Sequence, residues 1–287
     1  MHFKEYKSIL SQKNGMNIYR GCTHGCIYCD SRSKCYHIDH QFEDIEVKEN
    51  APLMLENELR KKKAPIMVGT GAMTDPYNHI DDQIHYTRQC LEVIHRYNCG
   101  ISIQTKSAKI LNDMDLYKQI NRDSKAVIQM TLTTYDDQLC KILEPNVSVT
   151  SERVEALKRF AEEGIKTIVW LCPILPWIND SEENLMGLLD YCSQANVYGI
   201  IFFGFGLTLR EGNREYFYQK LDQHFPGLKE KYEKTFGQMY ECSSPNNDKL
   251  TQLLISECAK RNIILDNDEL FKFMAEYPKK NQQMSLF

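Results

Sequence analysis

The sequence has no long apolar stretch, and none of its hydrophobic runs approaches the roughly 18 to 20 residues that a membrane-spanning helix needs. It also lacks a strong charge bias, because 35 Lys and Arg against 39 Asp and Glu give a formal net charge of −4. No overall positive field therefore attracts nucleic acid, and such binding would need a local patch. No hydrophobic leader opens the sequence, so we expect a cytoplasmic protein without a membrane partner.

Low-complexity tracts and internal repeats are also missing, which excludes a solenoid. A chain of 287 residues with 42% hydrophobic and 26% charged residues is typical of a globular protein with one large domain or a domain with an appendage. Its eleven cysteines are scattered along the chain, so a reducing cytoplasm fits better than a secreted disulfide scaffold.

Short apolar runs alternate with amphipathic segments from residue 15 onward, which indicates parallel strands joined by helices. We predict strands at Met16–Tyr19, Ile66–Gly69, Gly100–Thr105, Val127–Thr133, Thr167–Leu171 and Gly199–Phe203. We predict the joining helices at Asp82–Tyr97, Lys109–Asn121, Ser151–Glu163 and Glu182–Gln194. The pattern favours an α/β fold built on one parallel sheet.

The most informative motif is a run of three cysteines, Cys22, Cys26 and Cys29, spaced CxxxCxxC. Three thiolates at this spacing can hold an iron–sulfur cluster and leave one iron without a protein ligand. A small molecule can then bind at that iron. The alternative is zinc, because His24 lies between two of the cysteines, but structural zinc usually needs a second CxxC or histidine pair downstream, and this chain has none. Inert buried thiols fit poorly in a loop flanked by glycines.

The cysteine spacing, with Tyr28 just before the last cysteine, resembles the radical S-adenosylmethionine (radical SAM) enzymes. Further segments resemble the branch of spore photoproduct lyase, or DNA repair photolyase-like proteins, over residues 15 to about 260: Thr74-Asp75-Pro76-Tyr77, Thr105-Lys106-Ser107, Thr131-Leu132-Thr133-Thr134, Leu143-Glu144-Pro145 and Pro173-Ile174-Leu175-Pro176.

The resemblance implies a partial (β/α)6 TIM-type barrel with the cysteine loop after its first strand. We expect an N-terminal extension at residues 1–14, the barrel at 15–205, a C-terminal helical appendage at 206–275 and a flexible tail at 276–287. Helical patterns in the appendage cover Glu211–Phe225, Gly227–Phe236 and Asn246–Arg261.

The resemblance also implies the cofactors. Cys22, Cys26 and Cys29 would hold a [4Fe-4S] cluster whose open iron chelates S-adenosylmethionine (SAM). An electron from an external donor would then cleave SAM to methionine and a 5′-deoxyadenosyl radical, which abstracts hydrogen from a substrate. The protein's own task is binding, orientation and exclusion of side reactions.

By the same resemblance, Thr74 and Asp75 bind the SAM ammonium group, Lys106 and Thr131 bind its carboxylate, and Tyr28 lies near the adenine. A cation in a barrel mouth is costly unless an anion meets it, which supports Lys106. The alternatives are a local turn at Thr74 and Asp75, a purely β-branched strand role for Thr131, and core packing for Tyr28. We interpret Glu144 and Arg153 as a structural ion pair.

The substrate is less well indicated. In spore photoproduct lyase a cysteine just before the ammonium-binding segment returns a hydrogen atom to the product, and Ala72 stands at that position here, which argues against the same repair route. The other candidates for a hydrogen donor are Cys242, Tyr240, Cys172 and Cys35, of which we favour Cys242, although each is by default a core residue.

The C-terminal residues Gln283, Met284, Ser285, Leu286 and Phe287 resemble the short peptide with which bacterial DNA polymerases and repair proteins bind the sliding clamp. Leu286 and Phe287 could fill an apolar pocket of the clamp, and Gln283 could form a hydrogen bond at its rim. The alternative is that the terminal Leu-Phe packs on the appendage. We therefore favour repair or modification of DNA. The alternatives are radical modification of a protein, peptide or small molecule, and a non-catalytic module in which the cysteines hold zinc.

Overall fold

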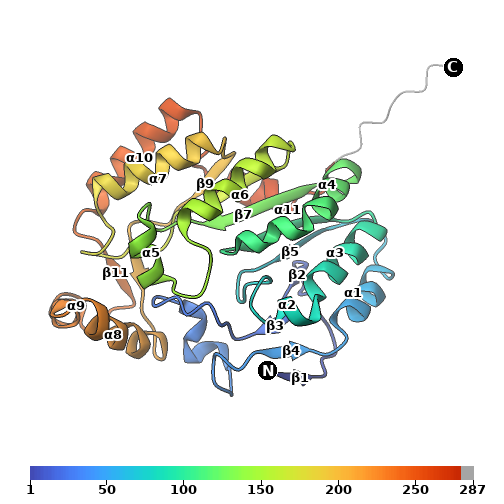
Figure 1. The fold of residues 1–287 in the computed structure, drawn as a ribbon, viewed down its shortest axis with the longest axis horizontal. Helices are drawn as coiled ribbons and strands as arrows, with labels where there is room; N and C mark the ends of the chain where they lie inside the picture. Colours follow the sequence, from blue (N-terminus) through green and yellow to red (C-terminus); the bar gives the residue numbers. More distant parts are fainter. Residues whose placement is uncertain (279–287) are drawn as a thin grey trace.

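The computed structural model describes residues 1–278 and is built on a six-stranded sheet (Figure 1). All neighbouring strands are parallel, and their order in the sheet follows their order in the chain. The strands are β2 (Gly15–Met16), β5 (Met67–Thr70), β6 (Gly100–Thr105), β7 (Ala126–Thr131), β8 (Lys166–Trp170) and β9 (Gly199–Ile201). An unreversed order of parallel strands is that of an open barrel, which confirms the predicted partial (β/α)6 architecture.

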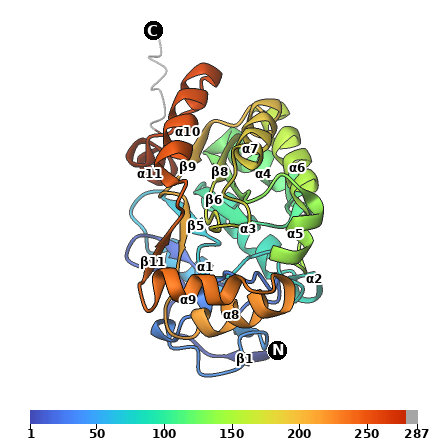
Figure 2. The ribbon, with the colours of Figure 1, turned by 90° about the vertical axis from the view of Figure 1, so that its left-hand side faces the viewer.

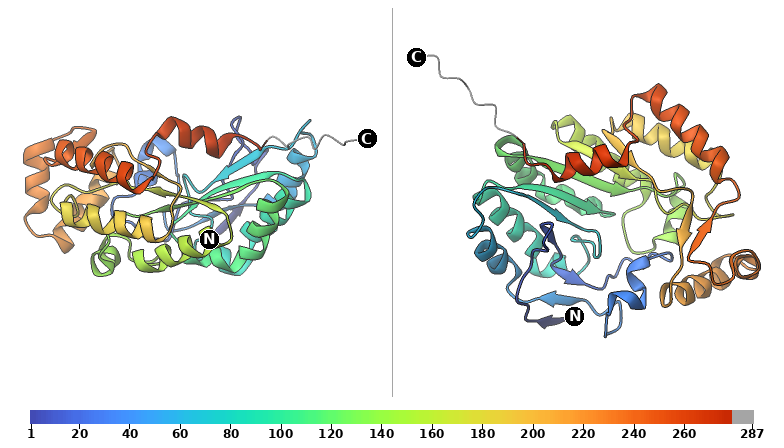
Figure 3. Two further views of the ribbon diagram at one scale, coloured as in Figure 1. Left: turned by 90° about the horizontal axis from the view of Figure 1, so that it is seen from above. Right: turned by 180° about the vertical axis from the view of Figure 1, so that it is seen from behind.

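Helices join the strands along one face of the sheet (Figures 1 and 3). They are α1 (Ala51–Leu59), α2 (Asp81–Ile84), α3 (Tyr86–Arg96), α4 (Met114–Asp123), α5 (Asp137–Leu143), α6 (Thr150–Glu162) and α7 (Glu182–Gln194). The helix predicted from Asp82 is interrupted, because His85 has a left-handed backbone (φ 54°) between α2 and α3. The one predicted from Lys109 begins as a 3-10 turn, η3 (Ala108–Asp113), before α4.

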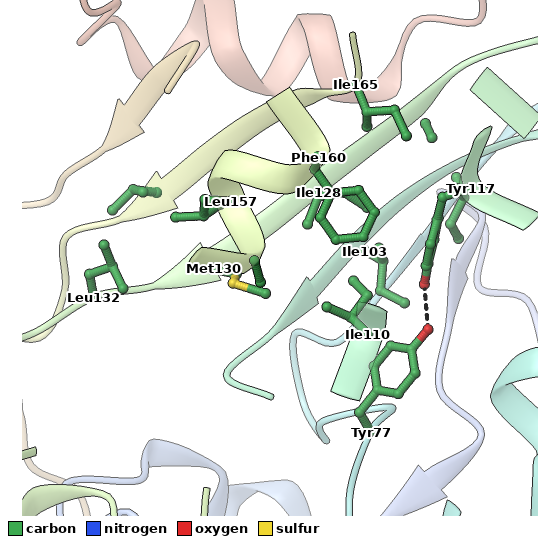
Figure 4. Close-up of a cluster of buried hydrophobic side chains, with 14 of the residues drawn as sticks. Tyr77, Ile103, Ile110, Tyr117, Ile128, Met130, Leu132, Leu157, Phe160 and Ile165 are labelled. Atoms are coloured by element: carbon green, nitrogen blue, oxygen red, sulfur yellow. Dashed lines mark hydrogen bonds between the residues drawn. The ribbon is translucent and has the colours of Figure 1, made fainter. Parts of the chain in front are cut away.

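The outer core lies between the sheet and these helices (Figure 4). Alternate residues of β7, Ile128 and Met130, point toward Leu157 and Phe160 of α6, and all four side chains are fully buried. On the strand every second residue is buried, and these residues pack against the apolar face of the helix. The sequence pattern predicts this packing. Burying each such side chain contributes about 1.5–3 kcal/mol.

The opposite, concave face of the sheet is covered by α11 (Asn267–Ala275), which the sequence did not reveal (Figure 3). Leu270 and Met274 pack against Val127 of β7, Ile168 of β8 and Ile201 of β9. Val127 lies near the amino end of its strand. Helix α11 therefore fills the amino-end part of the barrel interior and leaves the carboxyl ends of the strands available for a site.

A first prediction concerns the packing of α11 inside the barrel. A Cβ at Gly199 would lie 2.4 and 2.9 Å from the two methyl carbons of Leu270, so Gly199→Ala forces the helix outward. We expect it to lower the free energy of unfolding by about 1–3 kcal/mol. Gly69→Ala is the control, because a Cβ there meets nothing within 4 Å. Equal urea midpoints for the two variants would contradict the packing described.

After β9 the chain forms an antiparallel hairpin of β10 (Gly206–Thr208) and β11 (Glu241–Ser243), with two helices between its strands. Helices α8 (Asn213–His224) and α9 (Leu228–Phe236) lie beside the cysteine loop, where Phe217 and Tyr232 pack in one cluster with Ile27 (Figure 2). Helix α10 (Asn247–Arg261) packs on α7. The three appended helices match the predicted segments within two residues.

The N-terminal residues form part of a second sheet. Strand β1 (His2–Lys4) pairs in parallel with β4 (Glu46–Lys48), which pairs antiparallel with β3 (Tyr19–Arg20). The predicted strand Met16–Tyr19 is thus wrong in extent, because its first residue belongs to the barrel and its last to this second sheet. Within residues 1–278, no helix has the length and apolar character to cross a bilayer.

Candidate active site

A cavity of about 600 Å³ lies at the carboxyl ends of the barrel strands, which is within the usual size range for small-molecule and cofactor sites. Every strand of the barrel except the short β2 contributes to its wall directly or through the loop that follows it. The predicted site residues all line it: Cys22, Cys26, Tyr28, Cys29, Thr74, Asp75, Lys106, Thr131 and Cys242.

The cysteine loop is held on two sides by backbone hydrogen bonds. The Cys22 amide donates to the Phe42 carbonyl (3.0 Å), and the Ile27 amide donates to the Leu143 carbonyl (2.9 Å). Gly21 has a φ of +83°, and a Cβ there would lie 2.4 Å from the Phe42 oxygen. Only glycine fits this close approach, so the residue before the first cysteine has to be glycine.

The three thiols suit an iron–sulfur cluster better than a single zinc ion. All three are free, and their sulfur atoms do not all lie within 4.8 Å of one another. A zinc ion with Zn–S bonds of about 2.3 Å would need sulfurs about 3.8 Å apart. His24, the other potential zinc ligand, is buried with its Nδ1 3.5 Å from Asp75 Oδ2. The donor set therefore fits a larger, cysteine-held group.

Burial makes these thiols poor acids until a metal binds. It raises the pKa of Cys22 to about 12 and that of Cys26 well above its ordinary value. Because metals bind the thiolate, loading this site must release protons.

Lys106, at the end of β6, is a cation at the cavity wall. Burial alone would lower its pKa, but the nearby Cys26 and Glu144 outweigh that effect and raise it. Its Nζ lies 5.8 Å from the centre of the Tyr28 ring, and among the described residues no carboxylate oxygen lies within 4.0 Å of it. A partly buried cation without a carboxylate partner favours an anionic ligand at this point of the cavity.

Asp75 already has three donors. Its carboxylate accepts hydrogen bonds from the Thr105 hydroxyl (2.7 Å), the Lys106 amide (2.7 Å) and the Tyr77 amide (2.9 Å). These bonds join the segment after β5 to the end of β6. Gly71 approaches β6 so closely that a Cβ would lie 1.9 Å from the Gln104 oxygen. The segment 71–74 is therefore held against β6 and lines the cavity.

Thr131 is 2% exposed, and its hydroxyl lies 3.5 Å from the Gln104 amide nitrogen. Gln104 also lines the cavity and was missed in the sequence. Gln104 could have been identified as a cavity residue from its position at the carboxyl end of β6, close to Lys106 in the sequence.

The predicted ion pair of Glu144 and Arg153 is present and fully buried. Arg153 Nη2 lies 2.5 Å from Glu144 Oε2, and neither side chain is accessible to solvent. The Tyr28 hydroxyl donates to the same carboxylate, while Arg153 donates to the Thr131 carbonyl (2.9 Å). The pair joins the cysteine loop to the end of β7, in agreement with a structural role.

The candidate hydrogen donors lie at different depths. Cys242, on β11, is fully buried in the cluster with Phe217 and Tyr232, and burial raises its pKa to about 11. Cys172 is half-buried at the cavity wall, and its pKa is also raised to about 11 by burial. Cys35 is exposed, 3.3 Å from Arg210 Nη1.

A group of aromatic side chains at the cavity was not predicted. Trp170 and Phe203 line the cavity, and Phe271 of α11 lies behind them, with ring centroids 6.0–6.2 Å apart. Phe203 is 63% exposed, although it is a large apolar residue. We call Trp170, Phe203 and Phe271 the aromatic wall. The clamp-binding-like residues Gln283 to Phe287 lie outside the described part of the chain.

The open parallel barrel thus brings three cysteines and the Lys106 ammonium group into one cavity at the carboxyl ends of its strands. The profile of the Radical SAM superfamily matches residues 16–189, which is more than half of the chain. The protein belongs to that superfamily. Its cofactors are a [4Fe-4S] cluster and SAM, and enzymes of this kind take their electron from an external donor.

Among curated proteins, an uncharacterized protein of Methanocaldococcus jannaschii is 32% identical over 169 residues, covering 58% of this chain and 62% of that protein. An uncharacterized protein of Mycobacterium tuberculosis is 26% identical over 229 residues, covering 77% of this chain and 66% of that protein. The chain thus spans slightly under two thirds of the length of these relatives.

Among solved structures, spore photoproduct lyase complexed with dinucleoside spore photoproduct is similar with a TM-score of 0.60 at 16% identity, covering 85% of this chain and 72% of that chain. The radical SAM methyltransferase TsrM of Kitasatospora setae has a TM-score of 0.56 at 11% identity, covering 88% and 54%. At these identities the likeness shows the fold.

Proposed function

We propose that this radical SAM enzyme acts on a base of DNA, in repair or modification. When bound, the cluster and SAM supply a 5′-deoxyadenosyl radical that abstracts hydrogen from the substrate. The aromatic wall is the observation on which the substrate proposal rests. Spore photoproduct lyase, which shares the fold, was solved with a dinucleoside, and this supports the same substrate class.

Different cavity residues hold the cluster and SAM. Cys22, Cys26 and Cys29 ligate the cluster, and Lys106 meets the SAM carboxylate with help from the Thr131 hydroxyl. Asp75 accepts three hydrogen bonds that position the segment before it, and Thr74 and Asp75, with the backbone carbonyls of residues 71–74, receive the SAM ammonium group. Tyr28, whose hydroxyl donates to Glu144, brings its ring from the cysteine loop to within 5.8 Å of the Lys106 Nζ.

The role of Lys106 gives a second prediction. A charge-assisted hydrogen bond contributes about 1.5–3 kcal/mol, so Lys106→Met should weaken SAM binding roughly ten- to hundred-fold. The measurement is the Kd of SAM for the cluster-loaded protein. Lys109→Met is the matched control, because that lysine is exposed and pairs with Asp82. An unchanged Kd in Lys106→Met would remove Lys106 from the site.

The aromatic wall suits a planar, unstacked ring. An exposed Phe203 beside Trp170 presents a flat apolar surface at the cavity, and stacking of one base on such a residue contributes about 1–3 kcal/mol. Trp170 is held in place, because its Nε1 donates to Gln129 (2.7 Å), whose Nε2 donates to Ser102 (2.8 Å). A base must leave the duplex to reach this wall, which is cheapest at damaged or single-stranded positions.

The experiment is DNA-stimulated cleavage of SAM. Reduced, cluster-loaded protein is given SAM with single-stranded or ultraviolet-damaged oligonucleotides, and 5′-deoxyadenosine is quantified. We expect DNA to raise its yield, and Phe203→Ala to reduce that stimulation about tenfold, in keeping with one lost stacking contact. Ile255→Ala, a similarly exposed apolar position on α10, should leave it unchanged. Stimulation by peptides but not by DNA would favour the alternative substrate class.

Two finer parts of the proposal concern the hydrogen donor and the sliding clamp. Ala72 lines the cavity without a thiol, so we retain Cys242 as the proposed donor and compare Cys242→Ala with Cys172→Ala, the other cavity cysteine. The C-terminal peptide remains a prediction from the sequence. Binding of the sliding clamp by the full chain but not by residues 1–278 is the expected result.

A further inference from the structure

We propose that His2, His40 and Asp44 form a binding site for a divalent transition-metal ion, with zinc as the natural probe. None of the three lines the cavity, so this site is separate from the cluster and SAM. They come from two segments: His2 is in β1, and the other two lie in the loop that precedes β4.

The three side chains converge. One ring nitrogen of each histidine and one oxygen of Asp44 lie within 4.8 Å of one another. The two imidazole rings are 4.9 Å apart at 83°, and the His2 Nδ1 lies 2.9 Å from Asp44 Oδ2. Small side-chain movements bring such atoms to the spacing at which one ion with metal–ligand bonds of about 2.0–2.2 Å contacts all three.

The second ring nitrogen of His40 is placed as in metal-bound histidines, which donate their other N–H to a carbonyl or carboxylate. His40 Nδ1 lies 2.9 Å from the Gln41 carbonyl oxygen, which only accepts, so Nδ1 carries the proton. His2 Nε2 lies 3.7 Å from Glu46 Oε2. The contact with Gln41 leaves His40 Nε2 as an unprotonated nitrogen that a metal can bind, whereas His2 Nδ1 donates to Asp44 in this structure and would give up that proton on coordination.

The His40 Nε2 atom gives independent support. It is buried, and among the described residues it has no hydrogen-bond partner. Buried polar atoms are normally paired, and one that is not calls for an explanation such as an ion. Coordination would supply the missing partner. Two imidazoles and a carboxylate suit zinc and similar ions rather than calcium or magnesium, which prefer oxygen ligands alone.

The site would stabilise the cysteine loop from outside. Phe42 lies between His40 and Asp44 in the chain, and its carbonyl accepts the hydrogen bond of the Cys22 amide. A metal that joins this loop to β1 would fix the position of that carbonyl. We therefore expect zinc to bind at this site and, once bound, to slow the loss of the cluster.

The test uses the cluster-loaded protein under anaerobic conditions, so that the three cysteines of the cavity are occupied. Zinc is added, excess is removed, and bound zinc is quantified and examined by zinc-edge X-ray absorption. We compare His40→Asn with His37→Asn, the same change at an exposed histidine nearby. Asp44→Asn is a second variant that alters the proposed metal site. Thermal unfolding without zinc confirms that each variant is folded.

We expect one zinc per chain with imidazole scattering and no sulfur ligands, retained in His37→Asn. In His40→Asn and Asp44→Asn zinc should bind on the order of ten-fold or more weakly. No retained zinc, sulfur ligation, or equal binding by the site variants and the control would each overturn the proposal. None of these readouts requires a substrate, so they are independent of the proposed action on DNA.

Discussion

The Cys26→Ala variant is expected to form no 5′-deoxyadenosine above the level of a protein-free control. A cluster with only two protein thiolates lacks the three-cysteine set that fits this cavity, and Cys26 is the most deeply buried of the three. Anaerobically reconstituted protein should lose most of its iron in this variant, and with it the cleavage of SAM. The measurement is iron per chain together with 5′-deoxyadenosine and methionine after reduction with dithionite.

The control for this variant is Cys35→Ala, which removes an exposed thiol just after the cysteine loop. It should retain both iron and activity. Equal iron and equal product in the two variants would show that Cys26 is no ligand. Stoichiometric zinc in place of iron in the wild type would instead favour the alternative in which the cysteines form a structural zinc module.

The Arg153→Ala variant is expected to lower the free energy of unfolding by about 3–5 kcal/mol, because it leaves the Glu144 carboxylate buried and unpaired. The measurement is equilibrium unfolding in urea. Arg159→Ala, on the exposed side of the same helix, should change stability by no more than about 0.5 kcal/mol. A similar small change in both variants would contradict the proposed contribution of the pair.

The pair also predicts a dependence on pH. Burial by itself would raise the pKa of Glu144, but Arg153 and Lys106 outweigh it and hold the pKa below its usual value. Such a carboxylate stabilises the fold fully above its unfolded pKa of about 4.3, and this contribution is lost as the pH falls through the folded value. The stability gap between the wild type and Glu144→Gln should therefore be largest at neutral pH and shrink on acidification.

The sequence predicted the barrel well because its signals are local. Each buried strand, such as Val127 to Thr133, is a short run rich in apolar and β-branched residues, and Lys106 and the cysteines come within a few residues after such runs. Parallel strands then bring these residues together at one end of the barrel. Conversely, β1 and β3 are only two or three residues long and pair across distant parts of the chain, so no periodicity reveals them.

Long-range packing also explains the other misses. Phe271 and Leu270 of α11 look like part of an ordinary amphipathic helix, and only the fold places them inside the barrel, one beside Phe203 and the other against Gly199. The aromatic wall therefore has no signature in the sequence. The hydrogen bonds of Asp75 could not be predicted for a similar reason, because two of its three donors come from Thr105 and Lys106, which only the fold brings beside it.

The most direct test of the account is the transfer of deuterium from DNA to the cofactor product. Cluster-loaded, reduced protein is incubated with SAM and a damaged oligonucleotide whose thymines are deuterated, and the 5′-deoxyadenosine is analysed by mass spectrometry. The account predicts deuterium in this product, with less of it in Phe203→Ala. Abundant 5′-deoxyadenosine without deuterium from any labelled DNA would contradict a DNA substrate while leaving the radical SAM chemistry intact.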